Sequence, residues 1–192
     1  AGNLLGPEQH GHMESVGYDM YCRLLDEAVR ELRGEPPRKE EAEVTIDINI
    51  DAYIDDSYIG NESRKIEMYK KIAAICDEND VIDIEDELTD RYGEIPAPVR
   101  NLIKVAHIKA IARSLGISSV TEKKDSVIFS FADSKSINFQ AIAKTAEKYK
   151  RQLLFSAGAS PYLVYRKPQI GADRLADNIK ILLQDLKSYD TG

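Results

Sequence analysis

The fold of this chain is decided by residues 81–115, which read VIDIEDELTDRYGEIPAPVRNLIKVAHIKAIARSL. The pattern predicts two helices that meet at a sharp corner. Gly93 ends the first helix, because glycine adopts the left-handed turn after a helix at little cost. Pro96 and Pro98 begin the second helix, since a first helical turn tolerates a missing N–H, and Gly116 ends it. We expect this helical hairpin to form the centre of the domain.

The two helices of the hairpin differ in their faces. The first has one apolar side, and acidic residues occupy the opposite side. The second carries apolar residues almost all round, so we expect it to be buried on most sides. The predicted core positions of the hairpin are Val81, Ile84, Leu88 and Tyr92 in the first helix, and Val99, Leu102, Ile103, Ala106, Ala110 and Ile111 in the second.

Acidic residues are concentrated in the first helix. Between Asp77 and Glu94 the chain has nine acidic residues and one basic residue, whereas the rest of the chain has 24 acidic and 25 basic residues. The formal net charge of -7 therefore comes from this segment. Such a face attracts basic protein surfaces, although patterning alone favours a simple solvated face. The candidate docking residues are Asp83, Asp86, Glu87 and Asp90.

Length and composition are those of an ordinary globular protein. The chain has 192 residues, of which 43% are hydrophobic and 31% charged, enough for one domain and an appendage. Cys22 and Cys76 are far apart in the sequence, so a disulfide framework is not supported and a reducing compartment is the default. No apolar run approaches the roughly 20 residues of a membrane helix. We therefore expect a cytoplasmic location and no membrane contact.

Domain organisation follows from a change in composition. Residues 34–42 are rich in glycine, proline and charge, which is typical of a linker. We expect a helical appendage over residues 1–33 and a compact domain over residues 43–192. Because the chain opens in the middle of a motif and without an initiator methionine, we expect a piece of a longer polypeptide.

The compact domain is predicted to have the α+β fold class, with the central helical hairpin packed against short antiparallel strands and flanking helices. Residues 44–50 alternate apolar and polar side chains, which indicates a half-buried strand. Residues 52–59 are expected to form an extended surface segment that is anchored by three large side chains. The other expected strands are 117–121, 127–131, 153–155 and 162–165, and the flanking helices are 61–77, capped by Asn61, 138–149, capped by Asn138, and 172–186.

Catalytic motifs are absent from the sequence. It contains no Walker phosphate loop, no dinucleotide-binding glycine motif, no zinc-protease motif and no nucleophile elbow. His10 and His12 flank Gly11, but a metal site needs further donors that the neighbouring sequence does not supply. His107 lies between apolar positions, where a structural histidine is favoured over a general base. We therefore expect no enzyme activity, metal or cofactor in this chain, and an interaction module is the best remaining class.

The chain resembles a known family at both ends. Residues 64–116 contain the elements MYKKIA, ELTDRYGEIP and LGI, which are similar to the C-terminal domain of bacterial transcription-repair coupling factors, the Mfd proteins. The N-terminal AGNLLGPEQHGH and GYDMYCRLL are similar to the end of the second RecA-like motor domain of that family. There Gln9 matches the glutamine in the tail of a translocation motif shared with RecG.

The resemblance implies a fragment of an ATP-dependent double-stranded DNA translocase that removes stalled RNA polymerase and recruits UvrA. ATP and Mg²⁺ would bind to motor domains upstream of this chain. In that family the C-terminal domain packs on an N-terminal UvrB-like module, covers its UvrA-binding surface and represses the motor. One departure is Asp55, which stands where the family usually has a proline and which leaves the conformation of residues 52–59 open.

An alternative function is an autonomous accessory domain that contacts DNA or RNA polymerase. The basic residues of the second helix argue for it only weakly, because they form the outer face of a buried helix and the neighbouring segment is strongly negative. Retention on a DNA or heparin column at moderate salt would separate this alternative from a regulatory docking domain.

Overall fold

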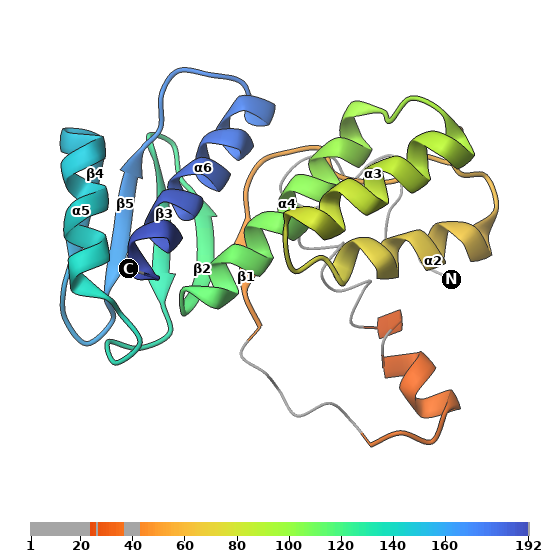
Figure 1. The fold of residues 1–192 in the computed structure, drawn as a ribbon, viewed down its shortest axis with the longest axis horizontal. Helices are drawn as coiled ribbons and strands as arrows, with labels where there is room; N and C mark the ends of the chain where they lie inside the picture. The colour runs from red at the N-terminus through yellow and green to blue at the C-terminus, as the bar shows by residue number, and fades with distance from the viewer. Residues whose placement is uncertain (1–23, 26, 37–42, 192) are drawn as a thin grey trace.

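The structure is a computed structural model that describes residues 24–25, 27–36 and 43–191. Residues 27–32 are helical, as predicted for the N-terminal appendage. Gln9, the His10 and His12 pair, and Cys22 lie outside the described residues. In the remainder, a sheet covered by helices occupies one end of the molecule and a group of helices occupies the other (Figure 1).

Secondary structure follows the predicted order of helices and strands. The strands are β1 Thr45–Asp47, β2 Ile117–Glu122, β3 Ser126–Phe131, β4 Leu153–Ser156 and β5 Tyr162–Arg166. The helices are α2 Glu62–Ala73, α3 Glu78–Tyr92, α4 Ala97–Ser114, α5 Phe139–Tyr149, the 3-10 helix η1 Lys150–Gln152 and α6 Ala172–Asp190.

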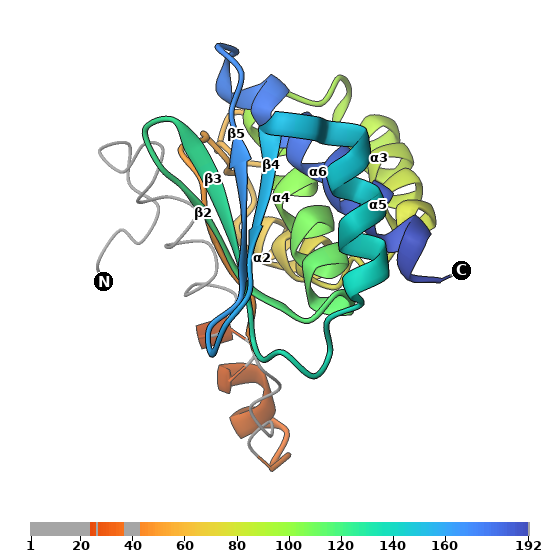
Figure 2. The same cartoon turned by 90° about the vertical axis from the view of Figure 1, so that its left-hand side faces the viewer.

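The strands form one mixed sheet in the order β1-β2-β3-β5-β4. The pairs β2–β3, β3–β5 and β4–β5 are antiparallel, as predicted, whereas β1 pairs with β2 in parallel, with Ile46 opposite Val120. This difference has a topological cause. The long connection from β1 to β2 contains α2, α3 and α4 and can cross over, which a parallel pair requires. The helices α4, α5 and α6 lie on one face of the sheet (Figure 2), and the α+β class is confirmed.

Local capping signals set the helix boundaries. The Asn61 carboxamide oxygen accepts a hydrogen bond from the Arg64 N–H at 3.1 Å, and Asn138 caps α5 in the same way. Helix α2 ends at Ala73, earlier than predicted, because Asp77 serves as the N-cap of α3. Cys76 is exposed in the turn between the two helices.

Residues 48–60 form a segment that we call the strap, which runs from β1 to α2. Large side chains anchor this segment to the core, as predicted, because Ile54 and Ile59 are buried, and the small Ala52 is buried with them. The alternation that begins in β1 continues here and places every second side chain in the core. Asp55 then turns the chain, since its Oδ1 accepts the Ser57 N–H at 2.8 Å. The Ser57 hydroxyl and, to a smaller extent, its N–H stabilise the carboxylate and lower the pKa of Asp55.

Helix α4 lies between the two ends of the molecule and contacts both. It packs against α6 and the sheet on one side and against α2 and α3 on the other (Figure 1). Leu102 and Ile108 have no exposed surface, and Ala110 is half-buried. The predicted burial of this helix on most sides is therefore confirmed.

Candidate docking surface on α3

Helix α3 is held by apolar side chains on one side and by a cap at its start. Val81, Ile84 and Leu88 are buried, as helical spacing predicts. At the N-terminus, the Asp77 carboxylate accepts a hydrogen bond from the Asp80 N–H at 3.0 Å. The Asp80 carboxylate in turn accepts the Cys76 N–H at 2.8 Å, so both acidic residues satisfy backbone donors of this turn.

Three of the four predicted docking residues lie on the exposed side of α3. Asp83, Asp86 and Asp90 are all exposed, and we call them the acidic ridge. None of them forms a salt bridge with a described residue. Their spacing of three and four residues places them along one stripe of the helix. The ridge therefore presents several uncompensated carboxylates from a helix whose opposite side is fixed in the core.

Glu87, the fourth predicted residue, has a different environment. Its Oε1 accepts hydrogen bonds from Lys71 Nζ at 2.8 Å and from Arg91 Nη1 at 2.9 Å. The Lys71 ammonium lowers the pKa of this carboxyl, because it stabilises the charged form. Glu87 thus joins α3 to α2, and its charge is neutralised by two bases. The structure separates it from the acidic ridge.

A hollow of about 280 Å³ opens beside the ridge, between α2 and α3. Its lining is mainly apolar and includes three carboxylates, of which Glu87 is already paired with Lys71, so it can accept the aliphatic stem and the charged head of a basic side chain. Sequence reasoning missed this hollow, because its two walls come from different helices. Its lining residues are Lys71, Ala74, Asp80, Asp83, Ile84 and Glu87.

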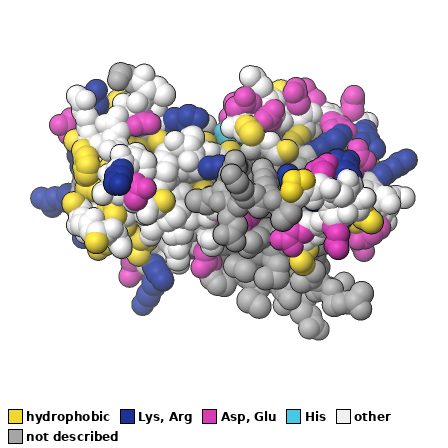
Figure 3. Space-filling model, turned by 90° about the horizontal axis from the view of Figure 1, so that it is seen from below, with side chains coloured by type: hydrophobic (Ala, Val, Ile, Leu, Met, Phe, Trp, Pro, Cys, Tyr) yellow, Lys and Arg dark blue, Asp and Glu magenta, His cyan; other side chains and the backbone are white. Residues whose placement is uncertain are grey.

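Formal charge divides the domain into two parts. Residues 51–96, which comprise most of the strap with α2 and α3 and which we call the helical lobe, have 14 acidic and five basic residues, a net charge of -9. Residues 97–191 have eight acidic and 16 basic residues, a net charge of +8. Figure 3 shows acidic side chains around the lobe that carries α2 and α3. The acidic ridge therefore lies within a field of one sign, which attracts basic surfaces over a distance.

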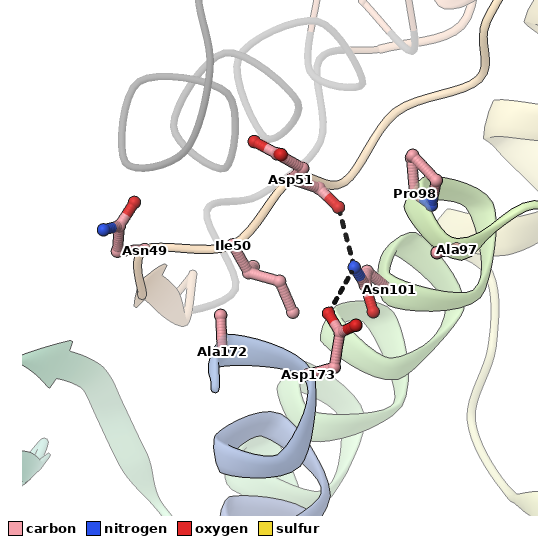
Figure 4. A pocket seen from close by; sticks show the side chains of 8 residues that line it. All are labelled: Asn49, Ile50, Asp51, Ala97, Pro98, Asn101, Ala172 and Asp173. Atoms are coloured by element: carbon pink, nitrogen blue, oxygen red, sulfur yellow. Dashed lines mark hydrogen bonds between the residues drawn. The ribbon is translucent and has the colours of Figure 1, made fainter. Parts of the chain in front are cut away.

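A second hollow, of about 250 Å³, lies where the strap meets the starts of α4 and α6 (Figure 4). The buried Asn101 amide donates hydrogen bonds to the Asp51 carbonyl and to Asp173 Oδ1, both at 2.9 Å. This side chain joins three segments that are distant in the sequence. A single asparagine among the apolar residues of α4 was the signal that could have identified it.

His107 lies on α4 and faces the start of α3. Its side chain is buried, and its Nδ1 lies 3.6 Å from Glu78 Oε2 at the start of α3. Burial lowers the pKa of His107, because the charged imidazolium is poorly solvated there.

Metal ligands do not gather within the described ranges, where no three His, Cys, Asp or Glu side chains approach one another as a metal site requires. No helix among the described residues is both long and apolar enough to cross a membrane.

Comparisons with known proteins identify relatives over most of the chain. The TRCF domain model matches residues 48–142. The transcription-repair-coupling factor of Bacillus subtilis (strain 168) is 34% identical over 190 residues, which are 97% of this chain and 16% of that protein. The same factor of Staphylococcus aureus (strain USA300) is 40% identical over 158 residues, which are 82% of this chain and 13% of that protein.

A solved structure has the same fold. The crystal structure of the C-terminal domain of a transcription-repair coupling factor matches with a TM-score of 0.70 at 21% identity, covering 78% of this chain and 95% of that one. The chain spans less than a fifth of the length of the two relatives named above. The chain belongs to the transcription-repair coupling factor family, as a C-terminal domain of such a factor.

Proposed function

We propose that this chain is the regulatory docking domain of its transcription-repair coupling factor. The acidic ridge binds a basic surface of the UvrB-like module in the same polypeptide and so masks the surface that UvrA recognises. The motor then stays repressed until RNA polymerase is engaged on double-stranded DNA. ATP and Mg²⁺ act in other domains of the factor, and this chain takes no part in their chemistry.

The observation that carries the proposal is the unpaired state of Asp83, Asp86 and Asp90 on a helix that is otherwise well anchored. Exposed charges of this kind contribute only about 0–1 kcal/mol each to folding stability. They act chiefly on association, by steering a complementary surface and fixing its orientation. A ridge within a lobe of net charge -9 suits an interface that must form and release.

The test is a binding titration between this chain and the purified UvrB-like module. Reversing two ridge charges, with Asp83→Lys and Asp86→Lys, is expected to weaken docking by about tenfold or more, as loss of two complementary pairs does. Raising the salt concentration should weaken docking of the unchanged chain in the same direction. The thermal midpoint of the variant should stay close to that of the unchanged chain.

A matched control reverses two exposed acids on the other part of the molecule, Glu147→Lys in α5 and Asp190→Lys in α6. This control changes the net charge by the same amount and should leave docking almost unchanged. Equal affinities for the ridge variant and the control, with salt also without effect, would mean that docking uses another face. Loss of UvrA masking only in the ridge variant would support the regulatory role.

A further inference from the structure

Strand β4 is a free edge of the sheet. It pairs with β5 alone, at the end of the strand order, and this edge is on the side of the molecule that faces the viewer in Figure 2. Residues Leu153–Ser156 contain no charge and no proline, and their pairing with β5 has no bulge. Proteins use those features to keep other strands from pairing with an edge. The strand is only four residues long, but this edge lacks charge, proline and a bulge as protection.

The phase of the hydrogen-bond ladder can be read from one contact. The Phe131 N–H donates to the Pro161 carbonyl at 3.0 Å, just outside the opposed pair Ser130 and Tyr162. Backbone groups of an antiparallel strand point alternately to its two neighbours. Tyr162 therefore directs its N–H and carbonyl away from β3 and toward Ser156, its partner in β4.

The same alternation decides which groups of β4 face the free edge. Ser156 and Leu154 bond to β5, so Leu153 and Phe155 point outward. The Leu153 N–H is already used, since it donates to the Lys150 carbonyl. The Leu153 carbonyl and both backbone groups of Phe155 remain available, and they can pair with one added strand.

Apolar side chains flank this edge on both faces of the sheet. On the face covered by helices, the Phe155 ring meets the Phe139 ring edge-on at 5.9 Å, and Phe139 is 55% exposed. On the opposite face, Leu154 is 51% exposed. Hydrophobic side chains gather along this end of the molecule in Figure 3 (left). An added strand would therefore find apolar contacts for side chains pointing to either face.

Basic residues mark one end of the edge. Lys150 and Arg151 immediately precede β4, and Arg166 follows Tyr165, which is opposite Leu153. The three bases are exposed, and none forms a salt bridge with a described residue. No acidic residue occurs from residue 150 to residue 161. The charge at this end thus favours a negatively charged partner.

We propose that the β4 edge is a docking site for an extended protein segment, which adds to the sheet as a further strand. The segment carries apolar side chains along the strand and acidic residues that meet Lys150, Arg151 and Arg166. A duplex nucleic acid would use the bases but neither the outward backbone groups nor Leu154 and Phe139. This site is separate from the acidic ridge and does not depend on the function proposed above.

The test uses the full chain and two short fluorescein-labelled peptides with the same alternating valine–threonine core, one flanked by aspartates and the other by lysines. Fluorescence anisotropy is expected to detect binding of the aspartate peptide and at least about tenfold weaker binding of the lysine peptide. Methylating the core amides of the aspartate peptide should abolish binding, because strand pairing needs those donors. In hydrogen exchange, the Phe155 amide should become protected when the peptide is bound.

Two variants test the site itself. Leu154→Lys places a lysine on the edge strand, which disfavours strand pairing, and the pair Lys150→Glu with Arg151→Glu reverses the charge beside it. Each of these variants is expected to weaken peptide binding by about tenfold. Their matched controls are Ile181→Lys, which is 47% exposed on α6, and the pair Arg64→Glu with Lys70→Glu on α2. Both controls should bind the aspartate peptide as well as the unchanged chain does.

Three results would overturn the proposal. One is equal binding of the methylated peptide, which would exclude strand addition. Another is binding of a duplex DNA probe that is sensitive to Lys150→Glu and Arg151→Glu, with no binding of either peptide. The third is a dimer in sedimentation that Leu154→Lys dissociates, since a second copy would then occupy the edge. The ridge variant with Asp83→Lys and Asp86→Lys should bind the peptide normally, which separates this site from the docking surface on α3.

Discussion

Acidic residues serve different purposes in the helical lobe and in the part of the domain that contains the sheet. In the latter, Asp185 accepts hydrogen bonds from Lys148 at 2.9 Å and from the Tyr149 hydroxyl at 2.7 Å, which joins α5 to α6. Lys167 pairs with Glu122 at 2.8 Å. On α3, by contrast, Asp83, Asp86 and Asp90 have no such partner among the described residues. The carboxylates of Asp185 and Glu122 connect elements of their own part, whereas the three aspartates of the ridge point outward from the helical lobe.

The two parts also differ in how their backbones are connected. Most of the sheet is held by a regular ladder of antiparallel pairs. In the helical lobe, tyrosine hydroxyls form hydrogen bonds to the backbone of other segments. The Tyr69 hydroxyl accepts the buried Ile54 N–H at 2.9 Å. The Tyr58 hydroxyl donates to the Gly93 carbonyl at 3.0 Å. This contrast suggests how the two parts can be perturbed separately.

The largest effects are expected from core truncations, one in each part. Leu88→Ala in α3 should cost roughly 2–5 kcal/mol and Phe129→Ala in β3 roughly 3–5 kcal/mol of unfolding free energy, since both side chains are fully buried. Urea unfolding measures each loss. Because α4 packs against both parts, we expect one cooperative transition in each variant. Two separate transitions would show that the parts unfold independently.

Asn101→Ala tests the connection between the strap, α4 and α6. The variant leaves the Asp51 carbonyl and the Asp173 carboxylate without the amide that they share, so we expect a loss of roughly 1–3 kcal/mol. Hydrogen exchange should speed up on both sides of the junction. If hydrogen exchange became faster only in α6, the strap would be held in place by its buried side chains and not by the Asn101 hydrogen bond.

The pH dependence of stability should report on His107. Burial lowers the pKa of His107 from its ordinary value of about 6.5 and outweighs the attraction of Glu78 and Asp77, while Lys180 and Lys187 act in the same direction as burial. The unfolded chain therefore binds a proton first as the pH falls below about 6.5, and the folded state loses stability. The slope for one proton is at most about 1.4 kcal/mol per pH unit. In urea unfolding at pH 7.5 and 5.5, His107→Gln should remove this slope, and a slope that persists would assign it to other groups.

The smallest effects on stability are expected from substitutions of surface charges on α3. Two such variants test whether the paired Glu87 and the unpaired ridge differ in their contribution to stability. Glu87→Gln loses its ion pairs with Lys71 and Arg91 and should cost about 0.5–1 kcal/mol. Asp90→Asn on the ridge should change stability by less than about 0.5 kcal/mol. Thermal unfolding compares the two variants directly. Equal losses would mean that the ridge carboxylate also stabilises the fold.

The sequence by itself determined the features that depend on neighbouring residues. Asn61 and Asn138 cap their helices where predicted, and Gly93 ends α3 with a φ of 84°. The hairpin of β2 and β3 and the pairing of β4 with β5 also follow from short-range patterns. These signals act over a few residues, because a cap, a turn or an amphipathic face is set by local geometry. Most of the α+β fold could be predicted for that reason.

Only the tertiary structure decided which distant residues meet. The parallel pairing of Ile46 with Val120, the burial of the strap and the contact of Asn101 with Asp173 all join segments that are far apart in the chain. The same holds for Glu87, whose position on α3 resembles that of the ridge aspartates until Lys71 of α2 approaches it. Helical periodicity fixes the side of a helix on which a charge lies. Whether that charge is free or paired depends on what the rest of the fold brings to it.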